Sequence, residues 1–282
     1  MLDMLKQARA AFALLNPQEV LQRAETPVRI GLVAVDLPGY AQLDDFLGYW
    51  PAGSNVFRAS DPVIPDDVEV VLCAPGIDAP RGAFELRAQA PSETIAEILS
   101  QREEFELALA RQFPVFRKTV VDGIVHAVAK ENALFAITTS LPDVLPSLFE
   151  LPWAMGEWAS DTAFLTVNQV RMAFQIAAAC GREVGFPHLK AEIFSIVAGA
   201  FGWRALAREL VGKIPFGGGL IPKGAVAYAG TYAVGKGLER LYNGGRGLTR
   251  RQFRDLYRHA LDRGRHVAGK LLDAGHRPET SS

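Results

Sequence analysis

Residues 28–39 read VRIGLVAVDLPG, and this stretch decides the first part of the fold. Its apolar, β-branched run up to residue 35 is typical of a strand buried on both faces, and the Asp-Leu-Pro-Gly that follows is a turn signal. Residues 68–76, VEVVLCAPG, repeat the pattern and predict a second buried strand at 68–73. Together these stretches indicate a small α/β layer with parallel strands.

Around these strands, strand and helix patterns alternate. The other elements expected are a helix at 41–49, strands at 55–59 and 83–88, and a long helix that begins at 91. For the long helix, Ser92 is predicted to be the N-cap, and Glu93 is favourable in the first turn. We therefore assign residues 1–112 to a small α/β domain.

From about residue 113 the spacing of apolar residues becomes helical, with interruptions by proline and glycine clusters. The helices expected lie near 115–130, 132–141, 162–181, 189–213, 222–243 and 248–273. The fold class predicted is α+β and mostly α, with a Gly/Ala-rich helical domain at 113–275 and a disordered tail at 276–282.

The composition is that of a globular protein, with 49% hydrophobic and 22% charged residues. Cys73 and Cys180 lie in separate apolar runs without a CxxC or His/Cys cluster, so we expect no metal site and no cofactor. Long uncharged runs such as 193–203 and 224–235 are shorter than the roughly 18–20 residues of a membrane span. Charged residues in the first stretch of the chain argue against a signal peptide.

No catalytic constellation is found in the sequence. The chain has 5 histidines, at positions 126, 188, 259, 266 and 276, and their scatter favours surface positions. Acidic pairs such as Asp44-Asp45 are adjacent in sequence, so they point to different faces or lie in loops. Neither a GxSxG nor an HExxH motif occurs. These observations predict a protein without enzymatic activity.

Two fragments resemble nucleotide-binding motifs. Gly230 to Lys236 fit the spacing G-x-x-x-x-G-K, but glycine follows the lysine where a Ser or Thr would bind magnesium, and the segment has helical spacing. We interpret this fragment as a decoy. Asp36 and Gly39 fit the DxxG motif that ends a strand in small GTPases, and a relic nucleotide site there stays open beside the commoner interpretation as a turn.

Small residues recur every four positions on the helix expected at 222–243, which makes one face nearly free of side chains. These residues are Ala225, Ala229, Ala233 and Gly237, with Gly199 and Gly202 as complementary positions on the preceding helix. Residues 214–242 would then form a hairpin with two open interpretations. It either dips into a bilayer or packs within the protein.

The net charge is −1, but the charges are unevenly distributed along the chain. Residues 236–270 contain ten Lys/Arg and three Asp/Glu and form a basic stretch. The basic positions on the last expected helix are Arg250, Arg251, Arg254, Arg258 and Arg265. A basic amphipathic helix suits an anionic membrane surface or an acidic protein partner, and a solvated helix face is the alternative. Because no fold that reads nucleic acid surrounds it, nucleic-acid binding is not expected.

Four stretches occur in the order ALFAITTSLPDVLPSLFELP, TVNQVRMAFQIAAACGREVG, FGWRALARELVGKIPFGGG and AYAGTYAVGKGLERLY. Residues 133–242, which contain them, resemble the helical domain of unknown function found behind Era-like GTPase domains and in YcjF-like inner-membrane proteins of bacteria. The resemblance implies membrane association or GTPase-linked scaffolding and transfers no catalytic residue. The matching polar positions, for which we favour an inward network that holds helices together, are Thr166, Asn168, Gln169, Arg171, Arg204 and Arg208.

The leading hypothesis is a non-enzymatic adaptor or scaffold that attaches peripherally to the cytoplasmic face of the inner membrane. Its partners would be the anionic membrane surface or a protein, with a GTPase and a second copy of the chain among the candidates. The alternatives are a degenerate nucleotide-binding protein and a soluble protein-interaction module without lipid affinity.

Overall fold

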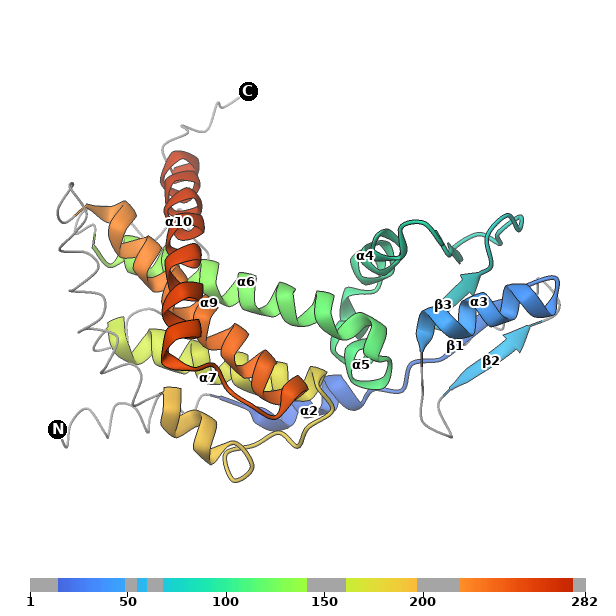
Figure 1. Ribbon diagram of the computed structural model, residues 1–282, viewed down its shortest axis with the longest axis horizontal. Coiled ribbons are helices and arrows are strands. Elements are labelled where there is room, and N and C mark those ends of the chain that lie inside the picture. The colour runs from blue at the N-terminus through green and yellow to red at the C-terminus, as the bar shows by residue number, and fades with distance from the viewer. Residues whose placement is uncertain (1–14, 49–54, 60–67, 141–160, 197–218, 276–282) are drawn as a thin grey trace. The chain divides into compact units, whose positions relative to one another are not determined.

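The computed structural model describes residues 15–48, 55–59, 68–140, 161–196 and 219–275 (Figure 1). The chain divides into two compact units. The sheet unit comprises Pro17–Gly123 and Ala177–Val184, and the helical unit comprises Met1–Asn16, Ile124–Ile176 and Gly185–Ser282. The boundary between Gly123 and Ile124 lies inside one long helix, whereas the sequence predicted it at 112/113. The fold class predicted is confirmed, because a small parallel sheet accompanies a majority of helix.

The sheet unit is built on four parallel strands in the order β2-β1-β3-β4. Its elements are α2 (Pro17–Glu25), β1 (Ile30–Val33), α3 (Leu37–Leu47), β2 (Val56–Ala59), β3 (Val70–Cys73), β4 (Phe84–Glu85), α4 (Pro91–Gln101), the 3₁₀ turn η1 (Glu103–Phe105) and α5 (Glu106–Gln112). In the register, Ile30 pairs with both Val56 and Val70. Every residue of β1 and β3 is buried, as their continuous apolar runs predict.

Local sequence signals start the helices of the sheet unit. Asp36 caps α3 by accepting a hydrogen bond from the backbone N–H of Gly39, and Gly48 ends the helix with a φ of 71°. For α4 the prediction of Ser92 as N-cap is wrong. Ala90 is the N-cap and makes no side-chain bond, because Pro91 takes the first helical position, where its fixed φ suits the helix.

The helical unit contains the C-terminal part of α6 (Pro114–Thr138), most of α7 (Asp161–Ala179), α9 (Leu220–Gly244) and α10 (Arg250–Gly275). The separate helices expected at 115–130 and 132–141 are one continuous helix, α6. The stretch between the two expected helices, residues 130–132, contains neither proline nor glycine, so no residue there interrupts the backbone hydrogen bonds of the helix.

A short turn joins α9 to α10, which pack side by side (Figure 1). Gly245, with a φ of 66°, ends α9 by donating its N–H to the carbonyl of Leu241. Thr249 and Gln252 then form a capping box. The N–H of Thr249 donates to Oε1 of Gln252 at 3.1 Å, and the N–H of Gln252 donates to Oγ1 of Thr249 at 3.3 Å. This pair starts α10.

Candidate functional site

The exposed side of α10 carries most of the basic residues predicted there. The arginine stripe consists of Arg251, Arg254, Arg258 and Arg265, all exposed. These positions recur at intervals of three, four and seven, so they follow one side of the helix. Arg250 is exposed at the start of the same helix. Asp262 pairs with Arg265 at 2.9 Å, so the stripe is partly neutralised at that end.

The other side of α10 is buried against α9. Ala225 and Ala229 of α9 share a core cluster with Tyr257, Ala260 and Leu261 of α10. The helices approach closely at Gly264, where a Cβ atom would lie 2.8 Å from the carbonyl oxygen of Ala225. The stripe is therefore held on a helix whose opposite face is anchored.

The small-residue face of α9 lies largely inside the helical unit. Ala225, Ala229 and Ala233 are fully buried, while Gly237 is partly exposed and lies close to Leu248. Small size is also required at Gly235, where a Cβ atom would lie 2.6 Å from Cγ2 of Val125. Gly199 and Gly202, the complementary positions predicted, lie outside the described residues. For Ala225 and Ala229 the partner is α10.

The predicted motif between Gly230 and Lys236 forms no loop. Both residues lie inside α9, and Lys236 pairs with Glu239 one turn later. The interpretation as a decoy is confirmed, because the backbone N–H groups of a helix interior bond within the helix instead of turning toward a phosphate.

A buried polar network links α6, α7 and α9. Nδ2 of Asn168 donates to Oδ1 of Asn132 at 2.9 Å, and Nδ2 of Asn132 donates to Oγ1 of Thr231 at 2.8 Å. Gln169 reaches the same hydroxyl at 3.3 Å. All of these residues are buried, and each bond satisfies a group that water cannot reach.

This network contains part of the set predicted from sequence. Asn168 and Gln169 belong to it, whereas Arg171 pairs with Glu131 at its margin. Arg204 and Arg208 lie outside the described residues. Sequence reasoning missed Asn132 and Thr231. The signal available was an asparagine and a threonine among the apolar and small residues of long helices, since neither favours a helix interior.

One histidine also departs from the prediction. His126 of α6 is partly buried and joins a cluster with α9 and α10, so its interpretation as a surface residue is wrong. Its Nδ1 lies 2.8 Å from the hydroxyl of Tyr228, and its Nε2 lies 3.4 Å from Nη1 of Arg263. The guanidinium of Arg263 also stacks over the ring of Tyr232, 5.6 Å from its centroid.

The predicted relic nucleotide site lies at the carboxyl edge of the sheet, between β1 and β3, where the strand order reverses. Here Oδ1 of Asp36 accepts the N–H of Gly39 at 2.8 Å, so its carboxylate occupies the helix N-terminus where a phosphate would bind. A Cβ atom on Gly39 would lie 3.0 Å from that of Ala34. Capping and close packing thus account for both residues of the motif.

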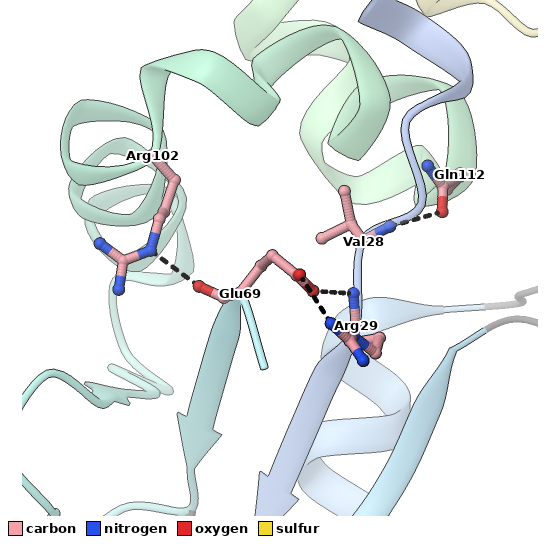
Figure 2. A network of polar contacts seen from close by, with 5 residues as sticks. All are labelled: Val28, Arg29, Glu69, Arg102 and Gln112. Atoms are coloured by element: carbon pink, nitrogen blue, oxygen red, sulfur yellow. Dashed lines mark hydrogen bonds and ion pairs between the residues drawn. The ribbon is translucent and has the colours of Figure 1, made fainter. Parts of the chain in front are cut away.

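A network of charged groups lies at the opposite end of the sheet, where β1 and β3 begin (Figure 2). The carboxylate of Glu69 accepts the backbone N–H of Arg29 at 2.6 Å and its guanidinium at 3.3 Å. Nε of Arg102 donates to the carbonyl of Glu69 at 2.7 Å. Burial raises the pKa of Glu69, but its bonds to Arg29 outweigh this and leave the pKa lowered. The network joins the starts of β1 and β3.

Among the residues that the structure describes, no cluster of three or more His, Cys, Asp or Glu residues is arranged to hold a metal ion. Burial and the nearby charge of Glu85 raise the pKa of the Cys73 thiol, which opposes the reactive thiolate form. In the described part of the chain, no helix combines the length and hydrophobicity needed to cross a bilayer.

Comparison of the chain with protein-family models, curated proteins and solved structures finds no match. The resemblance of residues 133–242 to the GTPase-associated helical domain therefore stays a prediction.

Proposed function

We propose that this protein is a non-enzymatic adaptor that attaches peripherally to an anionic membrane surface through the arginine stripe of α10. The observation that carries the proposal is the exposure of these arginines along one side of a helix whose other side is buried against α9. A surface of this kind attracts phosphate headgroups without any insertion of the helix.

The strength expected of this attraction is modest. Each arginine near an anionic leaflet contributes about 1 kcal/mol, so the stripe supplies at most roughly 4 kcal/mol. Asp262 lowers the share of Arg265 because it already pairs with that side chain. Binding should therefore be reversible and should weaken strongly as salt shortens the Debye length from about 8 Å to about 3 Å.

The geometry favours this surface over insertion of the 214–242 hairpin. Ala225 and Ala229 are buried against α10, and exposing them to lipid would require α10 to separate from α9. The small size of Ala225 is also explained by the close approach of the two helices at Gly264. A peripheral, electrostatic attachment needs no such rearrangement.

Flotation of the full chain with vesicles tests the proposal. We expect binding to vesicles that contain phosphatidylglycerol, none to pure phosphatidylcholine, and release by salt. Replacing every arginine of the stripe by glutamine should abolish flotation. A control with the same loss of charge changes exposed cations elsewhere, namely Arg23, Arg81, Lys130 and Lys190, and should float like the unchanged protein.

Two results would overturn the proposal. Failure of the unchanged chain to float with anionic vesicles at low salt would leave the protein-interaction module as the better function. Equal loss of flotation in the stripe variant and in the control would mean that net charge, and not α10, determines binding.

A further inference from the structure

The exposed side of α10 carries two histidines beside the arginine stripe. His259 and His266 are both exposed, and their spacing of seven residues places them on one side of the helix, two turns apart. His259 directly follows Arg258, and His266 directly follows Arg265. At 3.6 residues per turn, the histidines therefore run alongside the stripe.

Both histidines lie within one turn of Asp262, the residue that neutralises part of the stripe. Asp262 is three residues after His259 and four before His266, so its carboxylate is a neighbour of both rings on the helix surface. This carboxylate pairs with Nη1 of Arg265 at 2.9 Å. A proton on either ring places a further cation beside it. Acid therefore adds positive charge to the part of α10 where the stripe is partly neutralised.

We propose that His259 and His266 belong to the membrane-attachment surface of α10 and strengthen the attachment in mild acid. Histidine is the side chain that gains a proton just below neutral pH. Each proton gives this surface one more cation, which anionic headgroups attract as they attract the arginines. The proposed regulation rests on the attachment through α10 described above and adds its dependence on pH.

The sign of the pH dependence follows from the potential of the membrane surface. A leaflet at about −30 mV concentrates protons, so the pH at its surface is about half a unit below that of the bulk solution. A histidine held at this surface therefore takes up a proton more readily than the same histidine in free protein. The bound state carries more protons, and binding strengthens as the pH falls through the histidine range near about 6.5.

The charged neighbours of the two rings on α10 leave this effect in place. They are the residues three or four positions from either histidine, where side chains meet on a helix surface. Two are anionic and two are cationic, namely Asp255, Asp262, Arg263 and Lys270. Because these charges balance, a proton gained by either ring adds one unit to the net charge of this face.

The helices that pack against α10 contribute groups of both signs. His126 of α6 and Tyr232 of α9 contact Arg263, at 3.4 Å from its Nη1 and with its guanidinium 5.6 Å from the ring centroid, respectively. Asp122 and Lys130 of α6 lie one turn to either side of His126 and carry opposite charges. These groups stay unchanged in variants of the α10 histidines, so such variants isolate the contribution of α10.

Flotation of the full chain with phosphatidylglycerol vesicles at low salt, at about pH 7.5 and about pH 5.5, tests the proposed regulation. The headgroup is a phosphodiester that keeps its negative charge over this range. One added cation near an anionic leaflet strengthens binding by about fivefold. We expect an increase of about tenfold for the two histidines together, because the nearby aspartates offset part of the added charge.

Two paired substitutions fix the histidine positions in one charge state each. The pair His259→Gln and His266→Gln should lose the increase in acid. The pair His259→Lys and His266→Lys carries both charges at either pH and should bind about tenfold more tightly than the unchanged chain at pH 7.5. Both positions are exposed, so neither pair should disturb folding. His188→Gln, at an exposed position of the helical unit outside α10, is the control and should keep the response.

The results distinguish the regulation from the attachment itself. If the unchanged protein floats equally well at both pH values, the attachment stands and the role of the histidines is overturned. The same conclusion follows if the glutamine pair keeps the tenfold increase. If the unchanged protein floats at neither pH, the attachment fails and the regulation fails with it.

Discussion

The two units each use arginine to join separate elements, but they give it different partners. In the sheet unit, Arg29 and Arg102 meet the carboxylate and the carbonyl of Glu69. In the helical unit, Arg263 meets the lone pair of His126. A carboxylate is an anion at neutral pH, whereas an imidazole nitrogen without a proton offers a single lone pair. The guanidinium of Arg29 therefore meets an anion, whereas that of Arg263 meets a ring nitrogen.

The two units also differ in the residues that form their buried cores. The sheet unit has apolar strands at its centre, with Leu32 and Leu72 fully buried. The helical unit instead places Asn132 and Thr231 between its helices. Its stability should therefore depend more on satisfied polar groups, and its core should respond more strongly to their removal.

The largest effect expected comes from Asn132→Ala. This change leaves the amide of Asn168 and the hydroxyl of Thr231 with fewer partners in a buried site, and it should destabilise the helical unit by about 2–4 kcal/mol. Urea denaturation measures the loss, and hydrogen exchange locates it in α6, α7 and α9. Lys130→Ala, at an exposed position of the same helix, should stay within about 0.5 kcal/mol. An equal loss of protection in β1 and β3 would show that the units do not unfold separately.

A smaller effect is expected from the close approach of α9 and α10. Gly264→Ala places a methyl group 2.8 Å from a backbone oxygen, so the helices must move apart at a cost of about 1–3 kcal/mol. Gly269→Ala is the matched control on the same helix, because nothing lies within 4 Å of its added Cβ. That change should stabilise by up to about 1 kcal/mol through helix propensity. Thermal denaturation of both variants should give shifts of opposite sign.

How far the sequence predicts this fold depends on the range of the interactions. The apolar composition of the runs that form β1 and β3 is enough to predict that these strands are buried. The four-residue spacing of alanine and glycine likewise predicts the small-residue face of α9. Asn132 and Thr231 could not be paired in advance, because the residues are distant in the chain and each alone is an ordinary polar side chain. The same holds for His126, whose contacts with Tyr228 and Arg263 come from other helices.

The network of Glu69 at the N-terminal ends of β1 and β3 should make stability depend on pH. Glu69→Gln removes a charge-assisted bond and should cost about 1–2 kcal/mol at neutral pH. The lowered pKa of Glu69 adds stability above the ordinary carboxyl value of 4.5, and this is lost as the pH falls through the lowered value. The two proteins should therefore converge in acid. Glu104→Gln, at an exposed position, is the control, and a constant difference at every pH would contradict the expectation.

The smallest effect expected separates the two interpretations of the motif at Asp36. If the carboxylate acts only as the N-cap of α3, Asp36→Ala should destabilise the sheet unit by about 1 kcal/mol, while Asp36→Ser, which keeps a capping oxygen, should be nearly neutral. A relic nucleotide site predicts something else, namely saturable binding of GTP or GDP that both variants lose. Denaturation of the three proteins, with titration of nucleotide by calorimetry, distinguishes these outcomes. Binding to the unchanged chain that disappears in Asp36→Ser without loss of stability would assign the carboxylate to a ligand, since capping alone cannot produce that combination.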